Sequence, residues 1–118
     1  MNGGFSTNYG NVVINDKVIA RMAGLTALGC FGIVGMAALS KRDGLVKILT
    51  RDSVSKGIRV TFEDQEISID FHVIIAYGVA VSAVAENLVS NVKYTIENAT
   101  GFKVREINIF VEGVRVID

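Results

Sequence analysis

The sequence contains no proline and no tryptophan, and it has one cysteine and one histidine in 118 residues. No linker, repeat or low-complexity run divides it, so its length predicts one domain. Because aromatic residues make up only 8% of the chain, the core must be built from valine, isoleucine, leucine and alanine. The single cysteine, Cys30, cannot form an internal disulfide, which is typical of proteins in a reducing compartment. Its sequence neighbours are apolar, which favours a buried, inert thiol.

An excess of charge of either sign is also missing. The formal net charge is zero, which removes long-range repulsion between copies and permits a homo-oligomer. The charges are unevenly placed, because residues 41–60 hold six basic and two acidic residues while residues 61–118 hold four basic and nine acidic ones. A basic middle segment is suited to docking an acidic partner. The alternative interpretation is an ordinary solvated surface.

A convincing membrane-spanning run is missing as well. Residues 22–39 carry no charge, but four glycines interrupt them, and glycine contributes little to membrane insertion. The first ten residues are polar and glycine-rich and lack the basic start of a signal peptide. We therefore predict a flexible tail over residues 1–9, a single domain over residues 10–118, and a cytoplasmic location.

Hydrophobic periodicity predicts two helices and several strands. The predicted helices cover residues 16–28 and 81–99, and the predicted strands cover residues 11–14, 45–51, 58–63, 67–75 and 104–116. The apolar run at residues 32–39 fits either a strand or a loop. Asn15 or Asp16 can cap the first helix, whereas Gly29 and Gly101 are suited to end the two helices.

The two middle strands predict a hairpin with one buried and one wet face. If Phe62 pairs with Ile67, Arg59 lies opposite Asp70 on the wet face, where an ion pair would contribute about 0.2–1 kcal/mol. Gln65 suits a primed two-residue turn poorly, so we expect a looser turn.

The apolar stripes predict how the elements pack. In the first helix the expected buried stripe is Val18, Met22 and Leu25, with Ile19 beside it. In the last strand the residues expected to face inward are Ile107, Ile109 and Val111, and Phe110 points to the other face. The sequence thus predicts an α+β fold, with two main helices packed on one face of a three- to four-stranded, mostly antiparallel sheet.

No group of residues in the sequence predicts catalysis. Ser68, Asp70 and His72 share one strand face, but members of a triad must point at each other across a cleft rather than stand parallel along a strand. His72 and Asp70 lack the further ligands of a metal site. We found no Walker-type loop and no dinucleotide-binding glycine motif. We therefore predict no catalytic residue, no metal, no cofactor and no small-molecule substrate.

One short motif offers an alternative function. Residues 29–32 form a GxxG sequence after a helix, and KH domains use GxxG to clamp a nucleic-acid backbone. Here Cys30 and Phe31 stand between the glycines, where a KH loop carries basic or polar residues. The competing interpretation is a tight turn in which glycine permits close packing. A KH-like nucleic-acid binder is the alternative hypothesis, and we regard nucleic acid as the less favoured partner.

Several short segments together resemble a known family. They are residues 10–19 (GNVVINDKVI), 29–35 (GCFGIVG), 57–60 (GIRV), 67–70 (ISID), 77–78 (YG), 100–102 (TGF) and 107–114 (INIFVEGV). In this order and spacing they resemble the alkaline shock proteins, also called envelope stress response proteins, of Gram-positive and related bacteria. The resemblance spans about residues 10–116, and it is nearest to short members without long polar tails.

The resemblance implies a non-enzymatic protein of cell-envelope homeostasis and stress. It implies a protein partner, in some relatives one at the membrane, and hence a peripheral position at the inner face of the membrane. Our leading hypothesis is a partner-binding scaffold or regulator. The candidate contact residues are Phe31 in the apolar run, the outward-facing Phe110, and Lys41 and Arg42 at the start of the basic segment.

Overall fold

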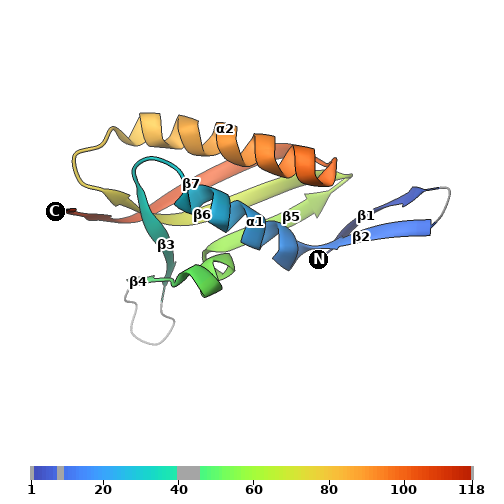
Figure 1. Ribbon diagram of the computed structural model, residues 1–118, viewed down its shortest axis with the longest axis horizontal. Helices are drawn as coiled ribbons and strands as arrows, with labels where there is room; N and C mark the ends of the chain where they lie inside the picture. Colours follow the sequence, from blue (N-terminus) through green and yellow to red (C-terminus); the bar gives the residue numbers. More distant parts are fainter. Residues whose placement is uncertain (1, 8–9, 40–45, 118) are drawn as a thin grey trace.

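The computed structural model describes residues 2–7, 10–39 and 46–117. These residues form two α-helices, one 3-10 helix and seven strands (Figure 1). Their order is β1 (Asn2–Thr7), β2 (Gly10–Asn15), α1 (Asp16–Leu28), β3 (Ile33–Leu39), β4 (Val46–Ile48), the 3-10 helix η1 (Arg51–Gly57), β5 (Ile58–Glu63), β6 (Glu66–Ala76), α2 (Val81–Thr100) and β7 (Lys103–Arg115). The chain is therefore α+β, as the sequence predicted.

Strand β6 is the centre of a five-stranded sheet. On one side it pairs antiparallel with β5 along its first part and with β3 along its last part. Strand β4 in turn pairs antiparallel with β3. On its other side β6 pairs in parallel with β7. The predicted strand number was too small, because the ambiguous apolar run forms β3. The parallel pair arises because α2 carries the chain back over the sheet, as in a βαβ crossover.

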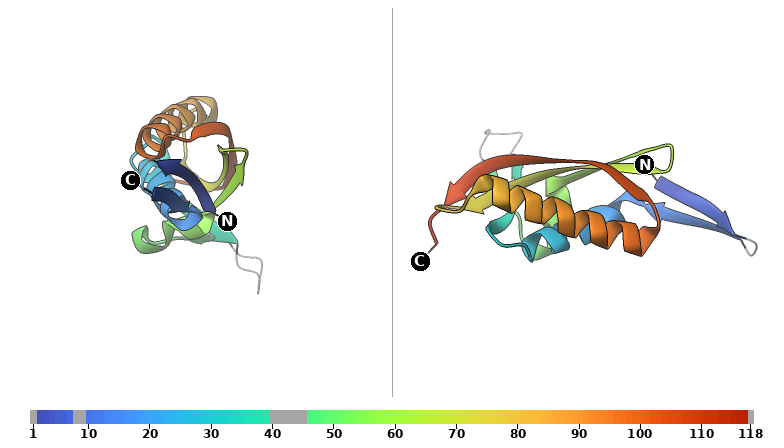
Figure 2. Two further views of the ribbon diagram at one scale, coloured as in Figure 1. Left: turned by 90° about the vertical axis from the view of Figure 1, so that its right-hand side faces the viewer. Right: turned by 90° about the horizontal axis from the view of Figure 1, so that it is seen from above.

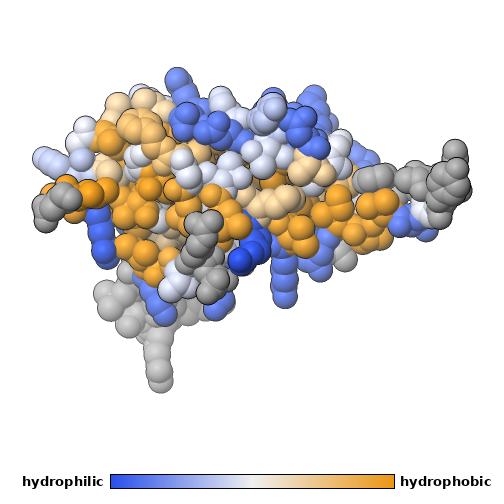
Figure 3. Space-filling view, viewed as in Figure 1, coloured by the Kyte–Doolittle hydropathy of each residue, from blue (hydrophilic) through white to orange (hydrophobic). Residues whose placement is uncertain are grey.

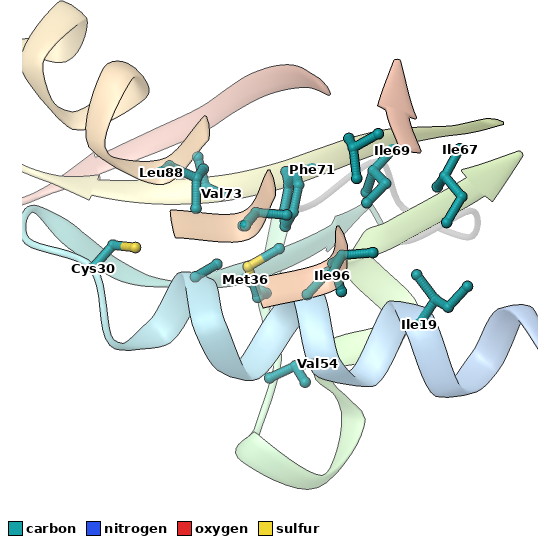
Figure 4. Close-up of a cluster of buried hydrophobic side chains, with 14 of the residues drawn as sticks. Ile19, Cys30, Met36, Val54, Ile67, Ile69, Phe71, Val73, Leu88 and Ile96 are labelled. Carbon is teal, nitrogen blue, oxygen red and sulfur yellow. The ribbon is translucent and has the colours of Figure 1, made fainter. Parts of the chain in front are cut away.

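Both helices lie on the same face of this sheet (Figure 2). The side chains of β6 that face the helices are fully buried or nearly so, with Phe71 at 0% exposure in the middle of the row. Ile19 of α1 and Leu88 and Ile96 of α2 belong to the same buried cluster (Figure 4). Apart from Phe71 and Phe102, this cluster is aliphatic or sulfur-containing, which fits a sequence without tryptophan.

The ends of both helices confirm the predictions. The side chain of Asn15 accepts a hydrogen bond from the Lys17 amide at the start of α1, and Gly29 ends that helix. Gly101 ends α2 in the left-handed conformation, with φ of 79°. At each of these three helix ends one short polar residue or glycine satisfies backbone groups that the helix leaves without partners.

The buried face of α1 differs from the predicted stripe by one residue. Val18 is 52% exposed, whereas Ile19, Ala23 and Ala27 are fully buried. Small residues occupy this face because α1 lies very close to its neighbours: a Cβ atom on Gly24 would sit 2.8 Å from Cγ2 of Val54 in η1. The prediction chose the larger apolar side chains as the buried face, so the predicted face was rotated about the helix axis relative to the observed one.

The β5–β6 hairpin has the predicted register and a tighter turn than predicted. Phe62 pairs with Ile67, and Arg59 lies opposite Asp70. Asp64 and Gln65 form the two-residue turn with φ of 50° and 68°, so the expectation of a looser turn was wrong. Strand pairing up to the turn imposes this backbone in spite of the unfavourable side chain at Gln65.

The N-terminal residues form a separate two-stranded hairpin. The sequence predicted a flexible tail over residues 1–9, whereas Asn2–Thr7 pair as β1 with β2. The hairpin projects from one end of the molecule (Figure 1). Its base lies against the main sheet, because a Cβ atom on Gly3 would clash with the ring of Phe62.

Candidate protein-interaction surface

The apolar run that included Phe31 is divided between core and surface. Phe31 is 56% exposed in the turn before β3, whereas Met36 and Ala37 within β3 are fully buried. The middle of this run is thus core, and only Phe31 among its described side chains is exposed. Lys41 and Arg42 lie outside the described residues, and of the remaining basic segment Lys47, Lys56 and Arg59 are exposed.

The GxxG loop packs into the protein. Cys30 is 6% exposed, and its Sγ receives a hydrogen bond of 3.4 Å from the side chain of Asn91 in α2. Gly32 has φ of 81°, and a Cβ atom there would clash with Val84 of α2. Close helix packing therefore explains both the glycine and the buried thiol.

The sheet face opposite the helices carries the polar row of β6. On this face the side chain of Asn108 donates to Oδ1 of Asp70 at 2.9 Å, and Nδ1 of His72 donates to Oε2 of Glu112 at 2.6 Å. Asp70 and His72 therefore each bind a residue of β7, rather than Ser68 or one another, as expected for side chains that stand parallel along a strand. Within the described part of the chain no cluster of three His, Cys, Asp or Glu residues is arranged to hold a metal ion.

Phe110 lies on this open face, as predicted. Its ring stacks on the imidazole of His72, with centroids 4.9 Å apart and planes 15° apart. One ring face is therefore covered by His72, and the side chain remains 46% exposed. A large aromatic side chain held in one orientation and still open to solvent is typical of a contact point for a partner.

Apolar exposure continues from Phe110 to the end of the chain. We call this surface the β7 apolar edge, and it consists of Phe110, Val111, Val114, Val116 and Ile117, which are 40–74% exposed. In the view of Figure 3, α2 presents mostly polar residues, whereas apolar residues spread along the molecule below it. At the other end of β7, Val104 is 4% exposed. The two halves of one strand thus have opposite surroundings.

The lengths of the elements explain this difference. A helix of 20 residues such as α2 is about 30 Å long, whereas an extended strand of 13 residues such as β7 is about 43 Å long. Because α2 leads through Gly101 directly into the start of β7, the helix covers roughly the first two thirds of the strand and falls short of the last third. In the described part of the sheet β7 pairs with β6 on one side, and no strand lies on its other side.

Sequence reasoning found Phe110 but missed Val111 and Val114. Both face the helix side of the sheet, opposite Val73 and Ile75 in the register, and the alternation predicted that Val111 would be buried. Alternating hydrophobicity predicts on which face of the sheet a side chain lies, but it does not predict whether another element covers that face. The length of the last predicted strand, compared with the helix before it, was the signal for the missing cover.

Neither helix in the described residues is both long and apolar enough to cross a membrane.

Comparison with known proteins identifies similar chains along almost the full length. A model of the alkaline shock protein family, which carries the description "cell envelope-related function", matches residues 4–116. YloU of Bacillus subtilis (strain 168) is 44% identical over 111 residues, which cover 93% of this chain and 92% of that protein. Spy1614 of Streptococcus pyogenes serotype M6 is 33% identical over 95% of this chain and 93% of that protein.

A more distant relative carries a functional name. The "stress response regulator gls24 homolog" of Streptococcus pyogenes serotype M3 is 23% identical over 90% of this chain, and the match covers 59% of that longer protein. No solved structure is significantly similar to the chain.

Proposed function

The chain belongs to the alkaline shock protein family, and from that premise we propose that it is a protein-binding scaffold or regulator in cell-envelope homeostasis and stress response. It acts at the inner face of the membrane through surface complementarity and carries out no reaction of its own. The family description, which names a cell envelope-related function, and the name of the regulator-like relative support the biological setting.

One observation carries the proposed mode of action: the β7 apolar edge is exposed on a strand whose outer side has no neighbour among the described strands. Exposed apolar side chains on both faces of one strand end mark an interaction site on a soluble protein. A long edge strand adds backbone hydrogen-bonding groups that can pair with another chain. Phe110 supplies the aromatic anchor that such interfaces favour.

Replacement of one aromatic residue in cells tests this proposal. The native gene is replaced by a Phe110→Ser variant or by the matched control Tyr94→Ser, whose aromatic ring on α2 is 73% exposed. We expect the Phe110→Ser strain to share the growth defect of the deletion strain in alkaline medium or under a cell-wall antibiotic. The Tyr94→Ser strain should grow like wild type.

Two further measurements make this test interpretable. Circular dichroism and immunoblotting establish that both variants are folded and equally abundant, and cross-linking in intact cells compares the species bound to each. The cross-linked species should disappear only in Phe110→Ser. Normal stress growth of a folded Phe110→Ser strain would contradict the proposal, as would co-purification of nucleic acid that moderate salt releases.

A further inference from the structure

We propose that the occupant of the β7 apolar edge is a second copy of this chain, whose β7 pairs antiparallel with it about a two-fold axis through Phe110. The inference rests on the proposed function, because it names the partner at the surface proposed there. Pairing would join two five-stranded sheets into one and place the two open faces side by side. The scaffold would then be a symmetric dimer.

The backbone of β7 is suited to such pairing. Its outer side has no strand beside it in the described part of the fold, and the strand contains no proline over its 13 residues. Edge strands normally avoid self-pairing by being short, by carrying proline, or by being covered. The second half of β7 is long, contains no proline and is not covered, and its protective features are the charged Arg115 and the bulge at Glu112.

The pairing of β7 with β6 defines which β7 side chains share a face. On the open face lie Glu106, Asn108, Phe110, Gly113 and Arg115, and on the helix face lie Val104, Ile107, Ile109, Val111 and Val114. Glu112 has no opposite residue in β6, because the register shifts there. It is the extra residue of a β-bulge.

An antiparallel pairing centred on Phe110 matches this order on both faces. With Glu112 again left out, every opposed pair consists of residues that share a face. On the open face Phe110 lies opposite its own copy, Asn108 lies opposite Gly113, and Glu106 lies opposite Arg115 of the second chain. On the helix face Ile109 lies opposite Val111 and Ile107 lies opposite Val114.

Charge selects this register among its neighbours. The two-fold axis creates the pair of Glu106 with Arg115 twice, once in each direction. Moving the centre to Ile109 sets Glu106 opposite Gly113, and moving it to Val111 sets Glu106 beyond the end of β7, so either shift loses both ion pairs. The net charge of zero adds no long-range repulsion between the copies.

The same register covers the apolar side chains that α2 leaves open. Val111 and Val114 are 40% and 55% exposed, and each meets an isoleucine of the second copy. The ring of Phe110, held against His72 at 4.9 Å, meets the same ring of the second chain. Aromatic pairs directly opposite one another are among the more favourable cross-strand contacts.

Charge reversal in two separate variants tests the proposal. Glu106→Arg alone sets arginine opposite arginine, and Arg115→Glu alone sets glutamate opposite glutamate. Both side chains are exposed, so neither change disturbs the core. Each variant alone should dimerise about tenfold more weakly than wild type, since two attractive pairs become repulsive.

A mixture of the two variants provides the control. In a heterodimer of Glu106→Arg with Arg115→Glu both pairs are attractive again, so an equimolar mixture should recover wild-type dimerisation in sedimentation velocity. The double variant on one chain should recover it as well. A wild-type chain that remains monomeric at high concentration overturns the proposal, and so do single variants that dimerise as wild type does.

Cysteine cross-linking tests the register independently. Only the central residue lies opposite itself, at a Cα separation of about 4.5–5.5 Å, which is within disulfide range. Because a disulfide traps even weakly associated chains, Phe110→Cys should form a disulfide-linked dimer under mild oxidation although the ring is lost, while the native Cys30 is buried. Asn108→Cys is the matched control, because its two copies lie about 13 Å apart along the strands. Equal cross-linking of both variants would overturn this register.

The outcomes separate this inference from the proposed function. If the purified chain does not dimerise but the Phe110→Ser strain still fails under envelope stress, the edge binds a different protein and the second copy is excluded. If charge reversal behaves as described but that strain grows normally, the dimer stands and the proposed envelope function fails.

Discussion

Two edge strands of the main sheet, β5 and β7, differ in length and in cover. Strand β5 has six residues, and beside it lies a pocket of about 340 Å³ lined in part by Asp16, Lys17 and Lys56. Strand β7 has 13 residues, and its second half is bordered by exposed valines. Charged neighbours and shortness protect an edge from pairing with other chains. The comparison shows that this fold protects one edge and leaves the other open.

The largest loss of stability is expected from a substitution in β6, the strand on which both edge strands pack. Phe71 lies in the middle of β6 at 0% exposure, between the two edges. Phe71→Ala should lower the free energy of unfolding by about 3–5 kcal/mol, because it leaves a large cavity in the core. Urea denaturation followed by circular dichroism measures this. A loss below about 1 kcal/mol would contradict the central position of Phe71 in the core.

A smaller loss of stability is expected from a substitution in α1 beneath β5, away from β7. A Cβ atom on Gly24 would lie 2.8 Å from Val54 and 3.0 Å from Ile58 at the start of β5. Gly24→Val should therefore destabilise the fold by about 1–3 kcal/mol through overpacking. The control is Gly29→Ala, whose Cβ atom meets nothing closer than 3.5 Å. The folded Gly24→Val protein should still dimerise as wild type does, and a loss of dimerisation would show that the edges are not independent.

Phe110→Ser should barely change the stability of the monomer. Its side chain is 46% exposed, so we expect a loss of at most about 1 kcal/mol in urea denaturation at low protein concentration. Association at higher concentration should nevertheless be lost. The contrast with Phe71→Ala separates a phenylalanine that holds the fold together from one that contacts a partner. A large loss of monomer stability would assign Phe110 to the fold instead.

The smallest expected effect is that of salt. The two ion pairs of Glu106 with Arg115 lie on an exposed face, so raising the ionic strength from low to about 0.5 M should weaken dimerisation only about two- to threefold. Sedimentation at several salt concentrations measures this change. A fall of several orders of magnitude would indicate that charge, rather than the apolar edge, drives association.

Local chemistry made part of this fold predictable. Asn15, Gly29 and Gly101 fixed the helix ends because capping depends on a single residue and its own backbone. The register of the β5–β6 hairpin was predictable because a short turn joins two strongly alternating strands. Phe110 was placed on the correct face because the last strand also alternates in hydrophobicity.

The remaining features depend on contacts that are distant in sequence. The apolar run that forms β3 lacks alternation, because consecutive residues in its middle, Gly35 to Ala37, are all buried. The parallel pairing of β6 with β7 is set by packing of the intervening helix. The exposure of Val111 and Val114 follows from the relative lengths of α2 and β7, which only the assembled fold makes visible.

Amide hydrogen exchange, measured at low and at high protein concentration, tests the contrast between the two edges most directly. If β7 pairs with a second copy, peptides from the second half of β7 should gain protection as concentration rises, whereas peptides from β5 (Ile58–Glu63) should not change. Glu106→Arg should shift the gain to about tenfold higher concentration, and mixing that variant with Arg115→Glu should restore the wild-type dependence. Unchanged exchange in β7, or equal protection in β5, would contradict the account.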